Sequence, residues 1–140
     1  MSMARIPYPD PSRYEREPLA ERIKRERGGK LLNLYKMLLH SPPIAEGWLA
    51  FLTGVRQKAV LSARLRELAI LRVAVKNGAE YEFDAHVPFA VEAGMGNAAI
   101  DALRAGRVPE GLDRADLAVI AYADSMTRDI RVPGAAGSKA

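Results

Sequence analysis

The stretch of sequence that decides the fold runs from Ser62 to Gly94 and reads SARLRELAILRVAVKNGAEYEFDAHVPFAVEAG. It contains two segments whose apolar residues recur at helical spacing, and only Asn77-Gly78 separates them. Serine is a favoured N-cap residue, and glycine is favoured just beyond a helix C-terminus. Ser62 and Gly78 therefore predict the ends of a first helix, and Gly94 predicts the end of a second. The stretch predicts two consecutive helices joined by a tight turn.

Helical spacing continues on both sides of this stretch. The further segments that carry it are residues 20–30, 31–41, 44–58, 97–106 and 113–128. Within the third of them, the positions expected to face inward are Ile44, Trp48, Leu49 and Leu52. We find no strand pattern and no internal repeat. The sequence therefore predicts an all-α, single-domain bundle of five to six helices connected by short loops.

The two ends of the chain differ in composition from its middle. Residues 1–18 contain four prolines, which favours an extended N-terminal arm. Residues 19–130 carry the helical pattern and are expected to form the domain. Residues 131–140 are rich in glycine and alanine and are expected to be a flexible tail.

Composition narrows the class of protein. The chain has 140 residues, of which 49% are hydrophobic, enough for the core of one domain. Its net charge of +4 is mild, and the basic excess lies in residues 1–30, mixed with acidic side chains. A nucleic-acid interface would favour clustered lysine and arginine with aromatic residues between them, so no such partner is expected.

The absence of cysteine limits the chemistry. It excludes disulfides, thiolate catalysis and cysteine-ligated metals. No apolar run approaches the length of about 20 residues that spans a bilayer, so no membrane partner is expected. The first residues lack the apolar core of a secretory signal, which predicts a cytoplasmic protein.

Three titratable residues fall on apolar helix faces. On a helical wheel Glu67 lands among the apolar residues of the first predicted helix. In the second, Glu82 and His86 are four residues apart and lie away from the acidic solvent face. An antiparallel hairpin would bring the three groups together, and a poorly solvated carboxylate–imidazole cluster suits general acid–base catalysis.

Structural interpretations of the same residues stay open. Glu82 and His86 can form an ordinary i,i+4 pair. Glu67 can be the buried partner of an arginine, either Arg66 or Arg72. No metal is expected, because only two neighbouring ligands are evident. The weakest candidate is Tyr81, which either donates a hydrogen bond to a substrate or is simply a half-exposed helix residue.

The segment LRELAILRVAVKNGAEYEFDAHVPFAVEAG resembles the carboxymuconolactone decarboxylase family, which includes alkylhydroperoxidase D-like proteins. GGKLLNLYKMLLHSPPIAEGWLAFL extends the likeness more loosely, to about two thirds of the chain. The alkylhydroperoxidase pattern is a glutamate, eleven residues, and then C-x-H-C-x-x-x-H. Counted from Glu67, the two cysteine positions hold Ala79 and Glu82, and the last histidine is His86. The chain therefore resembles the cysteine-free branch, in which the thiol chemistry of the peroxidases cannot run.

The resemblance implies a helical subunit that assembles into trimers or hexamers and needs no cofactor. For the decarboxylases it implies a γ-lactone carboxylate from aromatic catabolism as the substrate. His86 would be the acid–base group, and Glu67 or Glu82 would orient it or share its proton.

These features and the resemblance suggest three candidate functions. The first is a cofactor-free acid–base lyase or isomerase that acts on a small carboxylated lactone or a related ring acid. The second is a non-catalytic, oligomeric small-molecule-binding module, which the missing cysteines favour. The third, a peroxidase function suggested by the family name alone, is rejected because the chain has no sulfur nucleophile.

Overall fold

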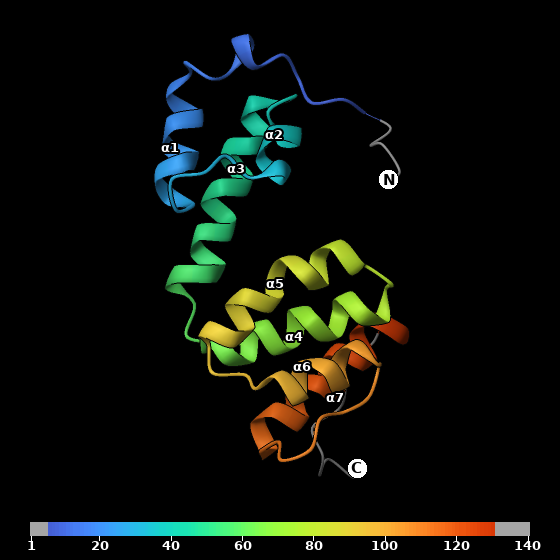
Figure 1. The fold of residues 1–140 in the computed structure, drawn as a ribbon. Helices are drawn as coiled ribbons and strands as arrows, with labels where there is room; N and C mark the ends of the chain where they lie inside the picture. Colours follow the sequence, from blue (N-terminus) through green and yellow to red (C-terminus); the bar gives the residue numbers. More distant parts are fainter. Residues whose placement is uncertain (1–5, 131–140) are drawn as a thin grey trace, which may run out of the picture. The chain divides into compact units, whose positions relative to one another are not determined.

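The computed structural model describes residues 6–130, and all regular structure in that range is helical (Figure 1). The α-helices are α1 (Pro18–Glu26), α2 (Asn33–Leu38), α3 (Pro42–Thr53), α4 (Ala63–Lys76), α5 (Glu80–Glu92), α6 (Asn97–Arg104) and α7 (Arg114–Arg128). A 3-10 helix, η1 (Pro11–Arg13), precedes them, and a π-helical turn, η2 (Gly54–Lys58), follows α3. None of these described helices is long and apolar enough to cross a membrane.

The all-α prediction is confirmed, but the described residues form seven α-helices where five to six were expected. Each of the seven overlaps one of the seven segments with helical spacing, and residues 20–30 and 31–41 give two separate helices, α1 and α2. Gly28 and Gly29 adopt φ angles of 70° and 82°, which other residues rarely tolerate. The chain therefore turns at these glycines, and α2 begins as a separate short helix. The expected tail, residues 131–140, lies outside the described residues, as do residues 1–5 of the expected arm.

The chain divides into two compact units, residues 1–59 and 60–140. They are called the N-terminal unit and the C-terminal unit below, and each is described by itself. The predicted boundaries after residues 18 and 130 stay predictions.

The N-terminal unit has its own small core. Its buried members are Tyr14, Ala20, Ile23, Tyr35, Leu39, Ala45 and Leu49. Part of the predicted arm belongs to this unit, because Tyr14 is buried and the Nε2 atom of His40 lies 2.8 Å from the carbonyl oxygen of Pro7. Arg27 links the helices by donating to the Tyr35 hydroxyl at 2.9 Å and to Thr53 Oγ1 at 3.1 Å.

The prediction for the inward face of α3 is wrong at two positions. Leu49 is buried, but Ile44 and Trp48 are 59% and 40% exposed. The helix packs on its own unit through Ala45 and Leu49, which turns the bulky residues outward. The exposed residues recur at helical spacing and form the α3 stripe, defined as Ile44, Trp48, Phe51 and Val55.

The C-terminal unit is built on the hairpin of α4 and α5, which lie side by side in Figure 1. The predicted turn is confirmed, with Gly78 at a φ of 63°. The predicted cap is also confirmed, since Ser62 Oγ accepts a hydrogen bond from the backbone of Leu65. Helices α6 and α7 complete a core whose buried members are Leu68, Leu71, Ala74, Phe83, Ala90, Met95, Ile100, Leu103 and Ile120.

Two arginine–aspartate pairs join α4 to α7. Arg64 donates to both carboxylate oxygens of Asp116, and Arg72 donates to both oxygens of Asp124 at 2.6 and 2.7 Å. Each aspartate lies 52 positions after its arginine, so the two helices run in the same direction. The sequence placed Arg72 on the polar side of α4 with Lys76, whereas Arg72 is buried. A helical wheel shows which residues share one side of a helix, but it does not show which other helix packs against that side.

Stability is expected to depend on pH through Asp116. Hydrogen bonds from Arg64 lower the pKa of this buried carboxyl below its ordinary value of 3.8, and they outweigh burial, which raises it. A carboxyl with a depressed folded-state pKa stabilises the fold above its unfolded value, and this stabilisation is lost as pH falls through the folded pKa. The free energy of unfolding, measured by urea titration, should therefore vary little between about pH 7 and 5 and fall below about pH 4.

Asp116→Asn removes the titrating group and should flatten the acid limb of that profile. A decline that already begins near neutral pH and is unchanged in Asp116→Asn would show that other groups control acid stability.

Candidate active site

The α4–α5 hairpin brings together the three residues that the sequence singled out. Glu67 lies in the middle of α4 on the side that faces α5, and it is fully buried. Glu82 and His86 lie one turn apart on α5. The tight turn at Gly78 returns α5 along α4, which is why residues 19 positions apart meet.

His86 lies between two carboxylates. Its Nδ1 atom is 2.6 Å from Glu67 Oε2, and its Nε2 atom is 3.3 Å from Glu82 Oε1. The other oxygen of Glu67 accepts a hydrogen bond from Nε of Arg66 at 3.2 Å. The imidazole ring also lies against Phe89, with the ring centres 5.7 Å apart. The result is a chain of contacts from Arg66 through Glu67 and His86 to Glu82.

The surroundings of Glu67 keep it ionised. Burial raises the pKa of Glu67, but the hydrogen bond and charge of His86, together with those of Arg66, outweigh this effect. The pKa of Glu67 therefore lies below its ordinary value of 4.5. At neutral pH the side chain is a buried carboxylate with a partner on each oxygen, as a buried charge requires.

An ionised carboxylate accepts hydrogen bonds and cannot donate them. The short contact with Glu67 therefore requires that the Nδ1 atom of His86 carries a proton. In the neutral ring Nε2 is then the unprotonated nitrogen, and in the charged ring both nitrogens donate. The Nε2 side faces Glu82, whose side chain is 55% exposed, whereas the side chain of His86 is only 12% exposed. The arrangement provides one buried orienting carboxylate and one nitrogen that can accept or deliver a proton.

The two histidines are expected to adopt opposite neutral tautomers. His86 should carry its proton on Nδ1, because Glu67 accepts there. His40 should carry its proton on Nε2, because the Pro7 carbonyl can only accept. Ring nitrogen shifts in a two-dimensional ¹H–¹⁵N spectrum at high pH distinguish the two forms. Glu67→Gln should remove the preference at His86 and leave His40 unchanged, whereas an Nε2 tautomer at His86 in the unsubstituted protein would contradict the geometry.

The other sequence candidates lie apart from this cluster. Tyr81 is on α5 but is 70% exposed, and its role in substrate binding stays a prediction. Of the two arginines considered as partners of Glu67, Arg66 contacts it, while Arg72 pairs with Asp124. In the sequence analysis an arginine partner and a histidine partner of Glu67 were alternatives. In the structure one carboxylate oxygen of Glu67 contacts Arg66 and the other contacts His86. Arg66 directly precedes Glu67 in the sequence, and this adjacency was the signal that could have indicated their contact.

No group of three or more histidine or acidic side chains suited to a metal ion occurs within residues 6–130. The expectation that the protein uses no metal and no cofactor stays a prediction.

A helical hairpin that aligns a buried carboxylate with a histidine defines a class of small all-α proteins with an acid–base cluster. The model of the carboxymuconolactone decarboxylase family matches residues 42–125, which is more than half of the chain. The protein therefore belongs to the carboxymuconolactone decarboxylase family. Comparisons with curated proteins and with solved structures gave no significant match. The matched range contains Glu67, Glu82 and His86.

Proposed function

We propose that the protein is a cofactor-free acid–base enzyme, a lyase or isomerase that acts on a small carboxylated lactone or a related ring acid. The observation that carries the proposal is the 2.6 Å contact between buried Glu67 and Nδ1 of His86. It leaves Nε2 as the nitrogen that exchanges a proton. Membership of the decarboxylase family supports the choice of substrate class.

In the decarboxylation, the bond between the ring carbon and the carboxylate breaks and CO2 leaves. The electron pair of that bond passes into the conjugated lactone, which becomes a carbanion equivalent. His86, charged at this point, delivers the Nε2 proton to carbon and becomes neutral, and a proton from solvent restores it. Glu67 holds the ring in position and stabilises its positive charge.

Glu82 has a different role from Glu67. Its carboxylate lies 3.3 Å from Nε2 and reaches solvent, so it can pass protons between water and the ring. A substrate carboxylate at the same place would be repelled by Glu82, so the substrate must approach Nε2 with its ring carbon. Glu82 is therefore a proton-sharing residue in this proposal, and Glu67 is the orienting residue.

The test is turnover of a γ-carboxylated muconolactone by purified protein treated with a chelator. We expect one CO2 released for each lactone consumed, and one solvent deuteron in the product when the reaction runs in D2O. If neither this lactone nor related ring carboxylates are consumed, the acid–base enzyme is excluded for this substrate class.

The alternative is a non-catalytic binding module with the same helices. The salt bridge from Arg66 to Glu67 favours it, because a carboxylate held by arginine can be purely structural. In that case ring carboxylates should bind without turnover, and Glu67→Gln should alter stability but not binding. The peroxidase function is not proposed, since the chain contains no cysteine.

We further propose that the protein forms a homo-oligomer, a trimer or a hexamer. The α3 stripe supports this, because large apolar side chains at helical spacing are costly to leave in water. Phe51, which is 64% exposed, lies within the stripe. Phe51→Glu should shift the mass measured by light scattering toward the monomer, while Tyr122→Glu, at an exposed aromatic on α7, should not. A monomeric parent protein would contradict the proposal.

A further inference from the structure

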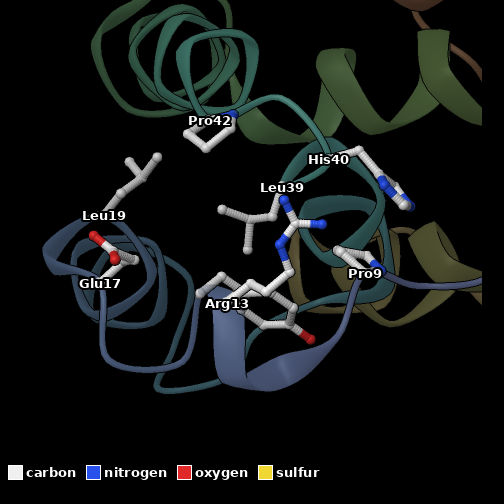
Figure 2. Close-up of a pocket in the computed structure, with 8 residues that line it drawn as sticks. Pro9, Arg13, Glu17, Leu19, Leu39, His40 and Pro42 are labelled. Atoms are coloured by element: carbon white, nitrogen blue, oxygen red, sulfur yellow. The ribbon is translucent and has the colours of Figure 1, made fainter.

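The N-terminal unit contains a pocket of about 370 Å³, a volume at the small end of the range for ligand sites. Figure 2 shows the side chains that surround it. Its lining residues are Pro9, Arg13, Tyr14, Glu17, Leu19, Leu39, His40 and Pro42. All of them belong to one unit, and none of them lies in the Glu67–His86 site.

Part of the pocket wall is apolar and belongs to the core of the unit. Leu39 and Tyr14 are each only 5% exposed and are part of the core of the unit. Leu19 packs against that core. His40 is held by its hydrogen bond to the Pro7 carbonyl, which fastens the segment before the pocket to the end of α2. A short aliphatic chain would find matching surface on the two leucines.

Two opposite charges line the pocket without pairing. Within the described part of the chain, neither the Arg13 nor the Glu17 side chain makes a hydrogen bond or an ion pair. Both residues are exposed, whereas Lys24 pairs with Glu21 at 2.8 Å elsewhere in the unit. Figure 2 shows the Glu17 carboxylate and the Arg13 guanidinium apart from each other, with the Leu39 side chain between them in this view. The pKa of Asp10 is lowered mainly by hydrogen bonds from Ser12 and less by the charge of Arg13.

We propose that this pocket binds a small ω-amino carboxylate, a zwitterion with an aliphatic chain between its charged ends. The ligand carboxylate would accept hydrogen bonds from the Arg13 guanidinium, and its ammonium group would donate to Glu17. Its methylene groups would lie on Leu19 and Leu39. A simple anion would bind Arg13 but would be repelled by the negative charge of Glu17. A simple amine would bind Glu17 but would be repelled by the positive charge of Arg13. The pair of charges therefore selects a ligand that carries both a carboxylate and an ammonium group.

The experiment titrates protein labelled at leucine methyl groups with 6-aminohexanoate and, separately, with hexanoate. We expect the methyl signals of Leu19 and Leu39 to shift with 6-aminohexanoate, while Leu103, in the core of the C-terminal unit, stays unchanged. Hexanoate should bind more weakly. Arg13→Gln should weaken 6-aminohexanoate binding by about tenfold or more, the usual effect of losing a charged hydrogen-bond partner.

Glu17→Gln separates this proposal from plain anion binding. It should weaken the binding of 6-aminohexanoate, because it removes the partner of the ammonium group. It should strengthen the binding of hexanoate, because it removes the charge that repels the carboxylate. Arg16→Gln, at an exposed arginine three residues from Arg13 and outside the pocket, should change neither titration. The proposal is overturned if hexanoate binds the unsubstituted protein as tightly as 6-aminohexanoate. It is also overturned if neither compound shifts the methyl signals of the two leucines at about 100 mM. At that concentration even a ligand with a Kd of about 10 mM would be mostly bound.

Discussion

His86→Gln is expected to lower the turnover of a carboxylated lactone by about 10²- to 10⁴-fold, the usual contribution of a general acid–base residue. The reason is that Nε2 of His86 is the nitrogen that exchanges a proton in the proposed reaction, while Nδ1 is held by Glu67 at 2.6 Å. Glutamine can neither take up nor release a proton at that position. The measurement is the rate of CO2 release at saturating lactone.

The matched control is His40→Gln, because the chain has only two histidines. His40 lies in the N-terminal unit and binds the Pro7 carbonyl, so its loss should leave the rate of CO2 release within about threefold of the original, consistent with the small effect of most surface changes. The circular dichroism spectrum of each variant shows whether its helices are retained. A folded His86→Gln protein with unchanged turnover would remove His86 from the mechanism.

The two glutamates should differ in the same assay. Glu67→Gln removes the buried negative charge that stabilises the charged ring, so the rate should fall nearly as far as in His86→Gln. Glu82→Gln removes a half-exposed group that water can replace, so the rate should fall much less. Equal losses in both variants would mean that the carboxylates act as an equivalent pair, which their different burial does not support.

Local signals in the sequence were sufficient to predict the hairpin that carries the site. Ser62 as a cap and Gly78 in the turn act within one or two residues of their own positions, so a neighbour in space is not needed to interpret them. The meeting of Glu67 with His86 followed from the same hairpin, since both residues had been placed on apolar faces that must pack together.

The features that the sequence did not predict depend on which element covers a given helix face. The pattern of α4 placed Arg72 beside Lys76, but only the packing of α7 brings Asp124 over that face and buries the arginine. The pattern of α3 is apolar nearly all round, and periodicity alone placed Trp48 inward, whereas it faces outward. Small Ala45 allows the close approach that selects the buried side.

The largest expected effect on stability comes from that same arginine. Arg72 is 4% exposed on its side chain, and it donates to both oxygens of Asp124 and to the carbonyl oxygen of Gly106. Asp124→Asn removes the negative charge and leaves the buried guanidinium with only neutral partners and a repulsive neighbour, Lys76. Breaking a buried pair from one side typically costs about 3–5 kcal/mol. Because Asp124 is 22% exposed, we expect about 3 kcal/mol, measured as the change in free energy of unfolding in urea.

Two further variants show whether burial is the cause. Asp129→Asn makes the same chemical change in an exposed pair with Arg128, whose side chain is 71% exposed, so it should leave the free energy of unfolding nearly unchanged. Arg72→Met in the Asp124→Asn background removes the stranded cation and should recover part of the loss, because a buried charge without a counterion is worse than an apolar side chain of similar size. Similar losses in Asp124→Asn and Asp129→Asn, with no recovery in the double variant, would mean that the pair acts as a surface ion pair and that Arg72 does not depend on Asp124 for its place between α4 and α7.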